Sequence, residues 1–397
     1  MKYLKSFLKS LMGQVILAVI LGIVLGNYAP IWFVRIFTTF NVLFSSVLSF
    51  SVPLLILALI TGAIADTDKG AGKMLIWTLA LSYISTVLAG IFTYFISDFT
   101  FPQIITMHAE DVSAVEGMLP PEALAPYFKI DFPPVMDTMS ALLLSFILGF
   151  AILKYNHRSI KSGVIELKDV VMMIICNIVL PLLPWYILGV FMKMTINGEM
   201  NLVVNVYLKV ILVMLAMFIV WLAIQYTIAG IVAKRNPLKC FVKMLPALVT
   251  ALASSSSAAT LPVTLKCAAK MNVRQNVIDF VIPMCANIHL SGASVRTISL
   301  AIATMIMYQM DYNFGLYLPF IFIFSITVLA APGIPGGVIM AAVGLLQSML
   351  GFSEPMLAIM ITLSIALDSF GTGVNVVGDG ALMLIIDKVT RPKKVTD

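Results

Sequence analysis

Charged side chains are scarce in this chain. Asp, Glu, Lys and Arg make up 11% of the 397 residues, whereas about 25% is usual in soluble domains. Hydrophobic residues make up 60%. The composition therefore excludes an ordinary soluble globular protein and predicts an all-α polytopic membrane protein.

Catalytic and redox signatures are also missing. The sequence has no HExxH or GxSxG motif, no P-loop and no nucleotide-binding fingerprint. It has four cysteines without CxxC spacing, in or beside apolar segments, which supports neither a disulfide framework nor a zinc site. We therefore expect no enzyme, no cofactor and no nucleic-acid partner. The lack of a Walker A motif argues against a pump with its ATPase in this chain.

Long apolar runs predict the spanning helices, each of which needs about 20 residues. The first follows a basic N-terminus without a cleavage site, so we interpret it as a spanning helix rather than a signal peptide. Six runs cover roughly 12–29, 37–65, 74–97, 137–153, 170–195 and 203–233. Four more cover 244–265, 277–308, 317–350 and 356–386. An acidic, proline-rich stretch at about 98–136 is expected to be the largest outer loop.

Two polar, small-residue stretches interrupt apolar sequence in the last third of the chain. They are Ser254–Thr264 and Ala331–Gly337. Non-helical backbone at bilayer depth occurs only where protein buries it or water lines it, and two matching breaks indicate a transport site between structural repeats. If 244–265 and 317–350 are re-entrant helical hairpins, the chain has eight transmembrane helices, with both termini on one side.

The basic residues support this layout. With the N-terminus in the cytoplasm, most of the 25 lysines and arginines fall in cytoplasmic segments, as the positive-inside rule predicts. Basic clusters also flank 244–265 on both sides, which favours a hairpin there over a span. We expect a multi-pass protein of the inner (cytoplasmic) membrane with both termini cytoplasmic.

Four polar residues recur along the last apolar run. Asp368, Thr372, Asn375 and Asp379 are spaced i, i+4, i+7 and i+11, so they form one stripe on a helix. A carboxylate inside a membrane helix needs a partner, a cation or water. The stripe indicates either a binding site or a structural hydrogen-bonded seam between helices.

The Ser254–Thr264 stretch resembles the serine-rich hairpin motif of the dicarboxylate/amino acid:cation symporters, the glutamate transporter homologues. The resemblance continues through Pro283–Gly292, Gly333–Gly336 and Asp368–Asp379. It implies an elevator-type fold, a homotrimer and a lipid-bilayer setting. It also implies that 1–243 is a six-helix part with scaffold and trimerisation helices plus helices 3 and 6 of a transport domain, and that 244–397 is the core transport region.

The resemblance implies three sets of site residues. The substrate would contact Ser255, Ser256, Ser257, Gly333, Asp368, Thr372 and Asn375, and we add Arg296 as a candidate that departs from the family pattern. The hydroxyl and N–H groups of the serines, at the start of a half-helix, suit a carboxylate. A coupling Na⁺ would be held by residues among Asn375, Asp379, His289, Ser291 and Asn287, and the gate would consist of Pro332, Gly333, Pro335 and Gly336.

Three departures from the family pattern affect these expectations. His289 and Ser291 stand where the family has the Asn and Asp of its Asn-Met-Asp-Gly-Thr motif, which leaves His289 either as a proton-coupling group or as a neutral hydrogen-bonding residue. The family's substrate arginine is absent, since its positions read Gly371 and Ser255. Arg296 lies inside a span and has three roles open: pairing with Asp368 or Asp379, replacing the missing arginine, or snorkelling.

We therefore predict a secondary transporter for a small amino acid or dicarboxylate, coupled to Na⁺ and/or H⁺. The missing arginine slightly favours a neutral amino acid. The alternatives are a channel-like or uncoupled anion or solute carrier on the same fold, and a membrane enzyme or sensor that has lost transport.

Overall fold

The computed structural model describes residues 10–65, 72–105, 121–130, 132–155, 158–198, 200–329, 331 and 336–391. Across these ranges the regular structure is helical, and no strand occurs in them. Seven helices in the described part are long and apolar enough to cross a membrane, judged by length and composition. The expectation of an all-helical chain is confirmed.

The predicted N-terminal spans correspond to helices that are mostly longer than expected. Their bounds are α2 (Leu11–Tyr28), α3 (Ile31–Ala65), α4 (Gly72–Ile104), the 3-10 turn η1 (Pro121–Leu124), α6 (Thr138–Tyr155), α7 (Arg158–Ile174), the π-helical η2 (Ile175–Val179), α8 (Leu180–Ile196) and α9 (Met200–Ala233). Asp98, expected in the outer loop, lies on α4 instead. Apolar sequence continues past it to Ile104, so the helix ends later than its charge pattern suggests.

The first interrupted segment is a helical hairpin, made of α10 (Pro237–Ser254) and α11 (Ser257–Ala269). The chain reverses at Ser255, which has a left-handed backbone with φ of 51°. The far ends of the two helices lie side by side, since Lys243 Nζ donates to the Lys270 carbonyl at 2.6 Å. The two basic clusters that flank this segment therefore lie together at one end of the molecule.

The second interrupted segment also folds back on itself. Helices α14 (Phe314–Leu329) and α15 (Gly337–Leu350) pack against each other. Gly336 begins α15 with a φ of +77°, a conformation that glycine adopts without strain. The far ends approach each other where a Cβ on Gly351 would lie 3.7 Å from Met310.

Two predicted single helices are broken in the structure. The run 277–308 forms α12 (Gln275–Ile288) and α13 (Ser291–Met307), separated at His289 and Leu290. The run 356–386 forms α16 (Glu354–Ala366) and α17 (Asp368–Val389), separated at Leu367. Hydropathy could not reveal these breaks, because the residues at them are no less apolar than their neighbours except for His289.

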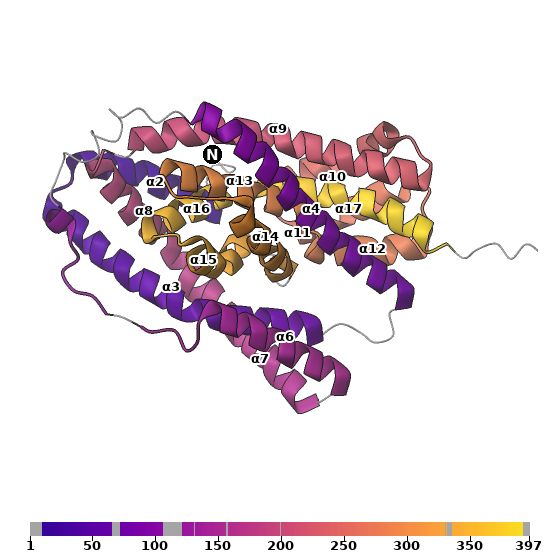
Figure 1. The fold of residues 1–397 in the computed structure, drawn as a ribbon, viewed down its shortest axis with the longest axis horizontal. Helices are drawn as coiled ribbons and strands as arrows, with labels where there is room; N and C mark the ends of the chain where they lie inside the picture. Colours follow the sequence, from indigo (N-terminus) through magenta and orange to yellow (C-terminus); the bar gives the residue numbers. More distant parts are fainter. Residues whose placement is uncertain are drawn as a thin grey trace, which may run out of the picture.

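The helices pack as two groups (Figure 1). In the first, α3 packs against α6, α7 and α8, and α2 packs along α8. In the second, α4 and α9 pack against α13 and α17, together with the hairpin α10–α11. Helices α13 and α17 are the most enclosed. In the most apolar 18 residues of Gln275–Met307, 94% of the residues are buried, against 28% of the residues of α2. The second hairpin lies between the groups, since α15 contacts α3 as well as α14 and α16.

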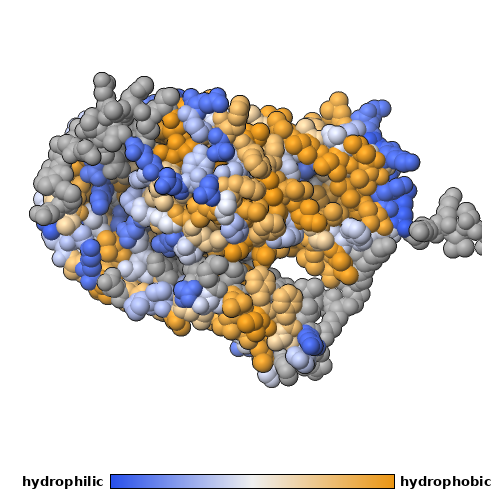
Figure 2. Space-filling model, in the orientation of Figure 1, coloured by the Kyte–Doolittle hydropathy of each residue, from blue (hydrophilic) through white to orange (hydrophobic). Residues whose placement is uncertain are grey.

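The surface is apolar over much of one face (Figure 2). Elsewhere, too, large hydrophobic side chains are open: Phe99, Ile219 and Ile231 are about 70% exposed, which suits contact with lipid rather than water. Hydrophilic residues gather at one end of the view, where α9 ends and α10 begins. There Arg235 bonds to the Met271 and Asn272 carbonyls.

Candidate functional site

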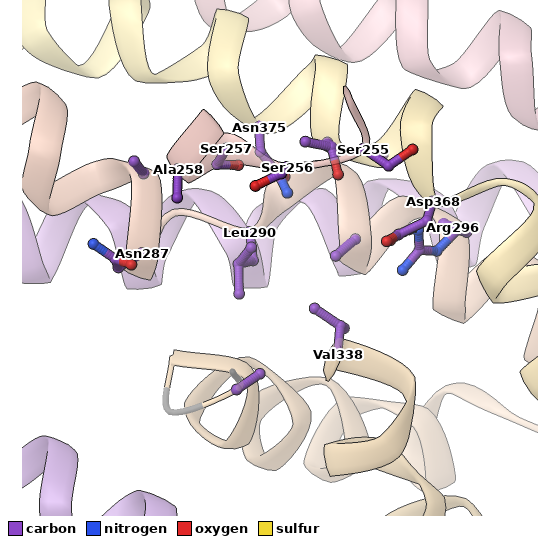
Figure 3. A pocket seen from close by; sticks show the side chains of 15 residues that line it. Ser255, Ser256, Ser257, Ala258, Asn287, Leu290, Arg296, Val338, Asp368 and Asn375 are labelled. Carbon is purple, nitrogen blue, oxygen red and sulfur yellow. Dashed lines mark hydrogen bonds and ion pairs between the residues drawn. The ribbon is translucent and has the colours of Figure 1, made fainter. Parts of the chain in front are cut away.

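A pocket lies where both hairpins, the α12–α13 break and α17 meet (Figure 3). It combines polar residues from three of these segments with apolar residues, which include Ala331 and Val338 of the second hairpin. Its lining consists of Ser255, Ser256, Ser257, Ala258, Ala286, Asn287, Leu290, Ala293, Arg296, Ala331, Val338, Asp368, Gly371, Thr372 and Asn375. All predicted substrate residues in the described part of the chain therefore line one cavity.

The serine-rich turn is an ordered helix start rather than a loose loop. Ser256 caps α11, because its Oγ accepts a hydrogen bond from the Ala259 N–H at 3.2 Å. The Ser254 hydroxyl bonds to Thr260 Oγ1 at 3.1 Å and accepts from the Ser256 N–H at 3.3 Å. The first N–H groups of a helix have no partner within it, so this turn presents donors to the pocket.

Asp368 and Arg296 form a buried ion pair at one end of the pocket. Arg296 Nη1 donates to Asp368 Oδ1 at 2.6 Å, and the arginine is 1% exposed. The other oxygen of Asp368 accepts from the Gly336 N–H at 3.3 Å, which links the pair to the start of α15. Of the partners considered from the sequence, the structure selects Asp368 over Asp379.

Asn375 joins α17 to the break between α12 and α13. Its Oδ1 accepts from the Gly292 N–H at 2.8 Å, which satisfies a donor at the start of α13. The helices touch here: a Cβ on Gly292 would lie 2.4 Å from the Gly371 carbonyl oxygen. Thr372 lies on the same side of α17 and lines the pocket.

At the break between α12 and α13, His289 is buried within a polar cluster. Its Nδ1 is 2.9 Å from Asp379 Oδ1, and its Nε2 is 3.0 Å from the Ser85 hydroxyl. Gln225 donates to Ser85 at 3.0 Å and to Ser291 at 3.3 Å. Gln225 was missed from the sequence, although an amide inside the apolar run 203–233 is a signal that could have revealed it.

This cluster fits Na⁺ only in part. Asp379 Oδ2 and Gln225 Oε1 are buried without a hydrogen-bond partner in the described part of the chain, and oxygen ligands of this kind suit a hard cation. Both ring nitrogens of His289 are engaged, however, so its imidazole offers no free ligand. The described residues contain no group of three His, Cys, Asp or Glu side chains that could hold a metal, so a Na⁺ site here would need amide, hydroxyl or carbonyl oxygens in addition to Asp379 Oδ2.

The other predicted residues have different positions. Asn287 lines the pocket but is exposed, and its amide donates to the Pro283 carbonyl at 3.0 Å. Pro332, Gly333 and Pro335, predicted as gate residues with Gly333 also contacting substrate, lie outside the described residues. Of the predicted gate, Gly336 is described and contacts Asp368.

Apolar helices that surround a polar pocket, with residues of two helical hairpins in its lining, define a multi-pass membrane transporter. The chain belongs to the sodium:dicarboxylate symporter family, whose model matches residues 11–389. This confirms the family resemblance and identifies sodium-coupled transport as the activity of the family.

Curated relatives resemble the chain to different extents. The serine/threonine transporter SstT of Acinetobacter baylyi is 25% identical over 371 residues, covering 89% of this chain and 91% of that protein. Excitatory amino acid transporter 3 of Oryctolagus cuniculus is 32% identical over 162 residues, covering 41% of this chain and 31% of that protein. Excitatory amino acid transporter 1 of Rattus norvegicus is 26% identical over 268 residues, covering 64% of this chain and 48% of that protein. The matches to the excitatory amino acid transporters thus span less than half of those proteins.

Proposed function

We propose that this chain is a secondary symporter of the cytoplasmic membrane that carries a small amino acid or dicarboxylate, coupled to Na⁺. The observation that carries the proposal is the pocket, where the donor-rich start of α11 faces the same cavity as Asp368, Thr372 and Asn375. Helix starts of this kind bind carboxylates. The names of the relatives, which include serine, threonine and excitatory amino acid transporters, are compatible with such a substrate.

Na⁺ is the proposed coupling ion because of the unpartnered oxygens of Asp379 and Gln225. Coupling to H⁺ is the second possibility, and the observation that favours it is the direct contact between His289 and Asp379. Uptake experiments separate the two, because a pH gradient alone drives only the second.

For transport we propose an elevator movement within a homotrimer. The group formed by α4, α9, α13, α17 and the first hairpin packs mostly within itself, and the group of α2, α3, α6, α7 and α8 does the same. Such a division suits movement of the first group, with the second hairpin, against a static second group. We also propose that both termini face the cytoplasm, following the distribution of basic residues.

Proteoliposome uptake tests the proposal. Purified full-length protein should accumulate a labelled amino acid or dicarboxylate when an inward Na⁺ gradient is imposed, and collapse of the gradient should abolish accumulation. Saturable uptake distinguishes a symporter from a channel-like carrier, which would instead give currents in planar bilayers. Absence of gradient-driven uptake for every amino acid and dicarboxylate tried would refute the proposal.

A further inference from the structure

Arg296 is a buried cation with only part of its donors in use. Its Nη1 donates to Asp368, whereas Nε and Nη2 are buried and have no hydrogen-bond partner among the described residues. A buried charged donor without a partner destabilises the fold. Arg296 also lines the pocket, so these two donors belong to a side chain that borders the cavity and have no partner among the described residues.

The two unpartnered nitrogens form one edge of the guanidinium group. Nε–H and one Nη2–H lie in the same plane and point in the same direction, which is the geometry that receives both oxygens of a carboxylate. Asp368 occupies a different nitrogen, Nη1. The pair with Asp368 therefore leaves the carboxylate-binding edge free and fixes the orientation of the side chain.

The pocket also holds a second, separate group of anion-binding donors. Ser256 and Ser257 lie at the start of α11, beside Asn375, whereas Arg296 and Asp368 lie together at one end of the view (Figure 3). A helix start binds one carboxylate, and the guanidinium edge suits another. The pocket is thus arranged for a molecule with two carboxylates.

Asp368, in contrast, is already compensated. One oxygen accepts from Arg296 and the other from the Gly336 N–H. A substrate ammonium group would have to replace the guanidinium as the partner of Asp368 and would leave Arg296 buried and unpaired, which is costly. This arrangement disfavours Asp368 as the receptor of an amino group.

Gly371 provides the space for the guanidinium. A Cβ at this position would lie 3.2 Å from Arg296 Nη1, closer than most Cβ contacts. Gly371 on α17 thus leaves the room that the guanidinium of Arg296, on α13, occupies. A long side chain at position 371 would extend from α17 towards the same end of the pocket.

We propose that Arg296 binds the second carboxylate of a dicarboxylic substrate through its Nε–Nη2 edge, and that Asp368 positions this guanidinium rather than receiving a substrate amino group. The proposal rests on the transport function above and names its substrate class. It differs from the sequence-based preference for a neutral amino acid. It also means that a substrate does not need an amino group in order to bind.

Calorimetric titration of the purified full-length protein in Na⁺ buffer tests the assignment with succinate, L-aspartate and L-serine as probes. Succinate and aspartate should bind with dissociation constants within about threefold of each other, and serine at least about tenfold more weakly, as expected for loss of a bidentate charged contact. Serine binding as tight as succinate binding, or no binding of either dicarboxylate, would overturn the proposal.

Two variants separate binding from structure. Arg296→Lys keeps the charge beside Asp368 but lacks the planar edge, so dicarboxylate affinity should fall at least about tenfold while serine affinity changes less than about threefold. The double change Arg296→Ser with Gly371→Arg returns a guanidinium from α17 and should recover much of the dicarboxylate affinity. An equal loss for all three probes in Arg296→Lys, with no recovery in the double variant, would show a structural role only.

Asp368→Asn tests the positioning role. If Asp368 only orients Arg296, the affinities for aspartate and succinate should change by the same factor, because neither depends on an ammonium contact. A selective loss of aspartate and serine binding, with succinate spared, would show that Asp368 receives the amino group and would refute this part of the proposal.

Uptake measured in parallel distinguishes this inference from the proposed function. Dicarboxylate binding that needs Arg296 but gives no Na⁺-driven uptake would refute transport and leave the assignment of Arg296 intact. Na⁺-driven uptake of serine without binding of either dicarboxylate would support transport and overturn the assignment.

Discussion

At the residue scale, the buried carboxylate of Asp379 has one oxygen in use and one free. Oδ1 is bonded to His289, and Oδ2 has no partner among the described residues. An anionic oxygen in that condition is costly unless a cation or a proton accompanies it. The neighbouring histidine cannot supply a second contact, because its other nitrogen bonds to Ser85.

Asp379→Asn should therefore weaken the response to Na⁺. The amide has a similar size but lacks the negative charge, so the Na⁺ concentration for half-maximal uptake should rise at least about tenfold, or about 1.4 kcal/mol. The control is Asp387→Asn, a carboxylate on the same helix that pairs with Arg274 at 2.7 Å and Arg391 at 2.8 Å. The control should lower thermal stability and leave the Na⁺ dependence unchanged, whereas unchanged Na⁺ dependence in Asp379→Asn would exclude this carboxylate from the site.

At the element scale, the first hairpin has one helix start in the pocket and another at its far end. Ser256 caps α11 at the pocket, and Asn236 caps α10 through a 3.0 Å bond from the Lys239 N–H. The two caps have the same local chemistry in different surroundings. They form a matched pair for separating stability from binding.

Ser256→Ala and Asn236→Ala should each destabilise the protein by about 1 kcal/mol, because each removes a cap. Only Ser256→Ala should also lower substrate affinity, since only that helix start lines the pocket. Thermal unfolding in detergent measures the first effect and calorimetric titration the second. If both variants bind substrate alike, the start of α11 takes no part in binding.

The close crossing of α13 and α17 depends on Gly292, which has no side chain. A Cβ on Gly292 would meet the Gly371 carbonyl oxygen at 2.4 Å. Both atoms are fixed to helix backbone, so the contact could be relieved only if α13 and α17 moved apart. Gly163, on α7, has nothing within 4 Å of its Cβ position. The two glycines thus differ in packing while sharing a helical backbone.

Gly292→Ala should destabilise the fold by about 1–3 kcal/mol or more through overpacking. Gly163→Ala should be neutral or stabilising by up to about 1 kcal/mol, because alanine favours the helix. Melting temperatures of the two purified variants check this. Equal melting temperatures would mean that α13 and α17 do not approach as closely as described.

At the scale of the whole molecule, the first hairpin returns both of its ends to the same side. The contacts of Lys243 with Lys270, and of Arg235 with Met271, place these ends together. Basic residues at one end and an apolar surface between the ends are what a bilayer requires of a protein that crosses it. Asn313, which directly precedes α14, lies at the start of the second hairpin, and we expect it on the opposite side of the membrane.

Labelling of single cysteines with a membrane-impermeant maleimide tests this arrangement. In a Cys176→Ser background the remaining native cysteines are buried, and Lys239, Lys270 and Asn313 are all exposed. In membrane vesicles Lys239→Cys and Lys270→Cys should react from the same side, and Asn313→Cys from the opposite side. Reaction of the first two from opposite sides would show that α10–α11 crosses the membrane.

The sequence by itself determined the membrane class, the positions of most helices and the polar stripe on α17. These features depend on composition and on periodicity within one segment, so they can be predicted without knowledge of tertiary contacts. The hairpin turn at Ser255 was also predictable, because four serines inside an apolar run cannot be accommodated at bilayer depth without a partner. The turn of the second hairpin was predicted from Pro332–Gly336, of which only Gly336 is described.

Only the tertiary structure decided which groups meet. Arg296 pairs with Asp368, which is 72 residues further along the chain, and His289 contacts Asp379, 90 residues away. Gln225 enters the cluster from α9, and Asn375 bonds to the N–H of Gly292. These partners depend on how distant helices cross. A polar residue in an apolar segment shows that it needs a partner, and packing alone selects which one it finds.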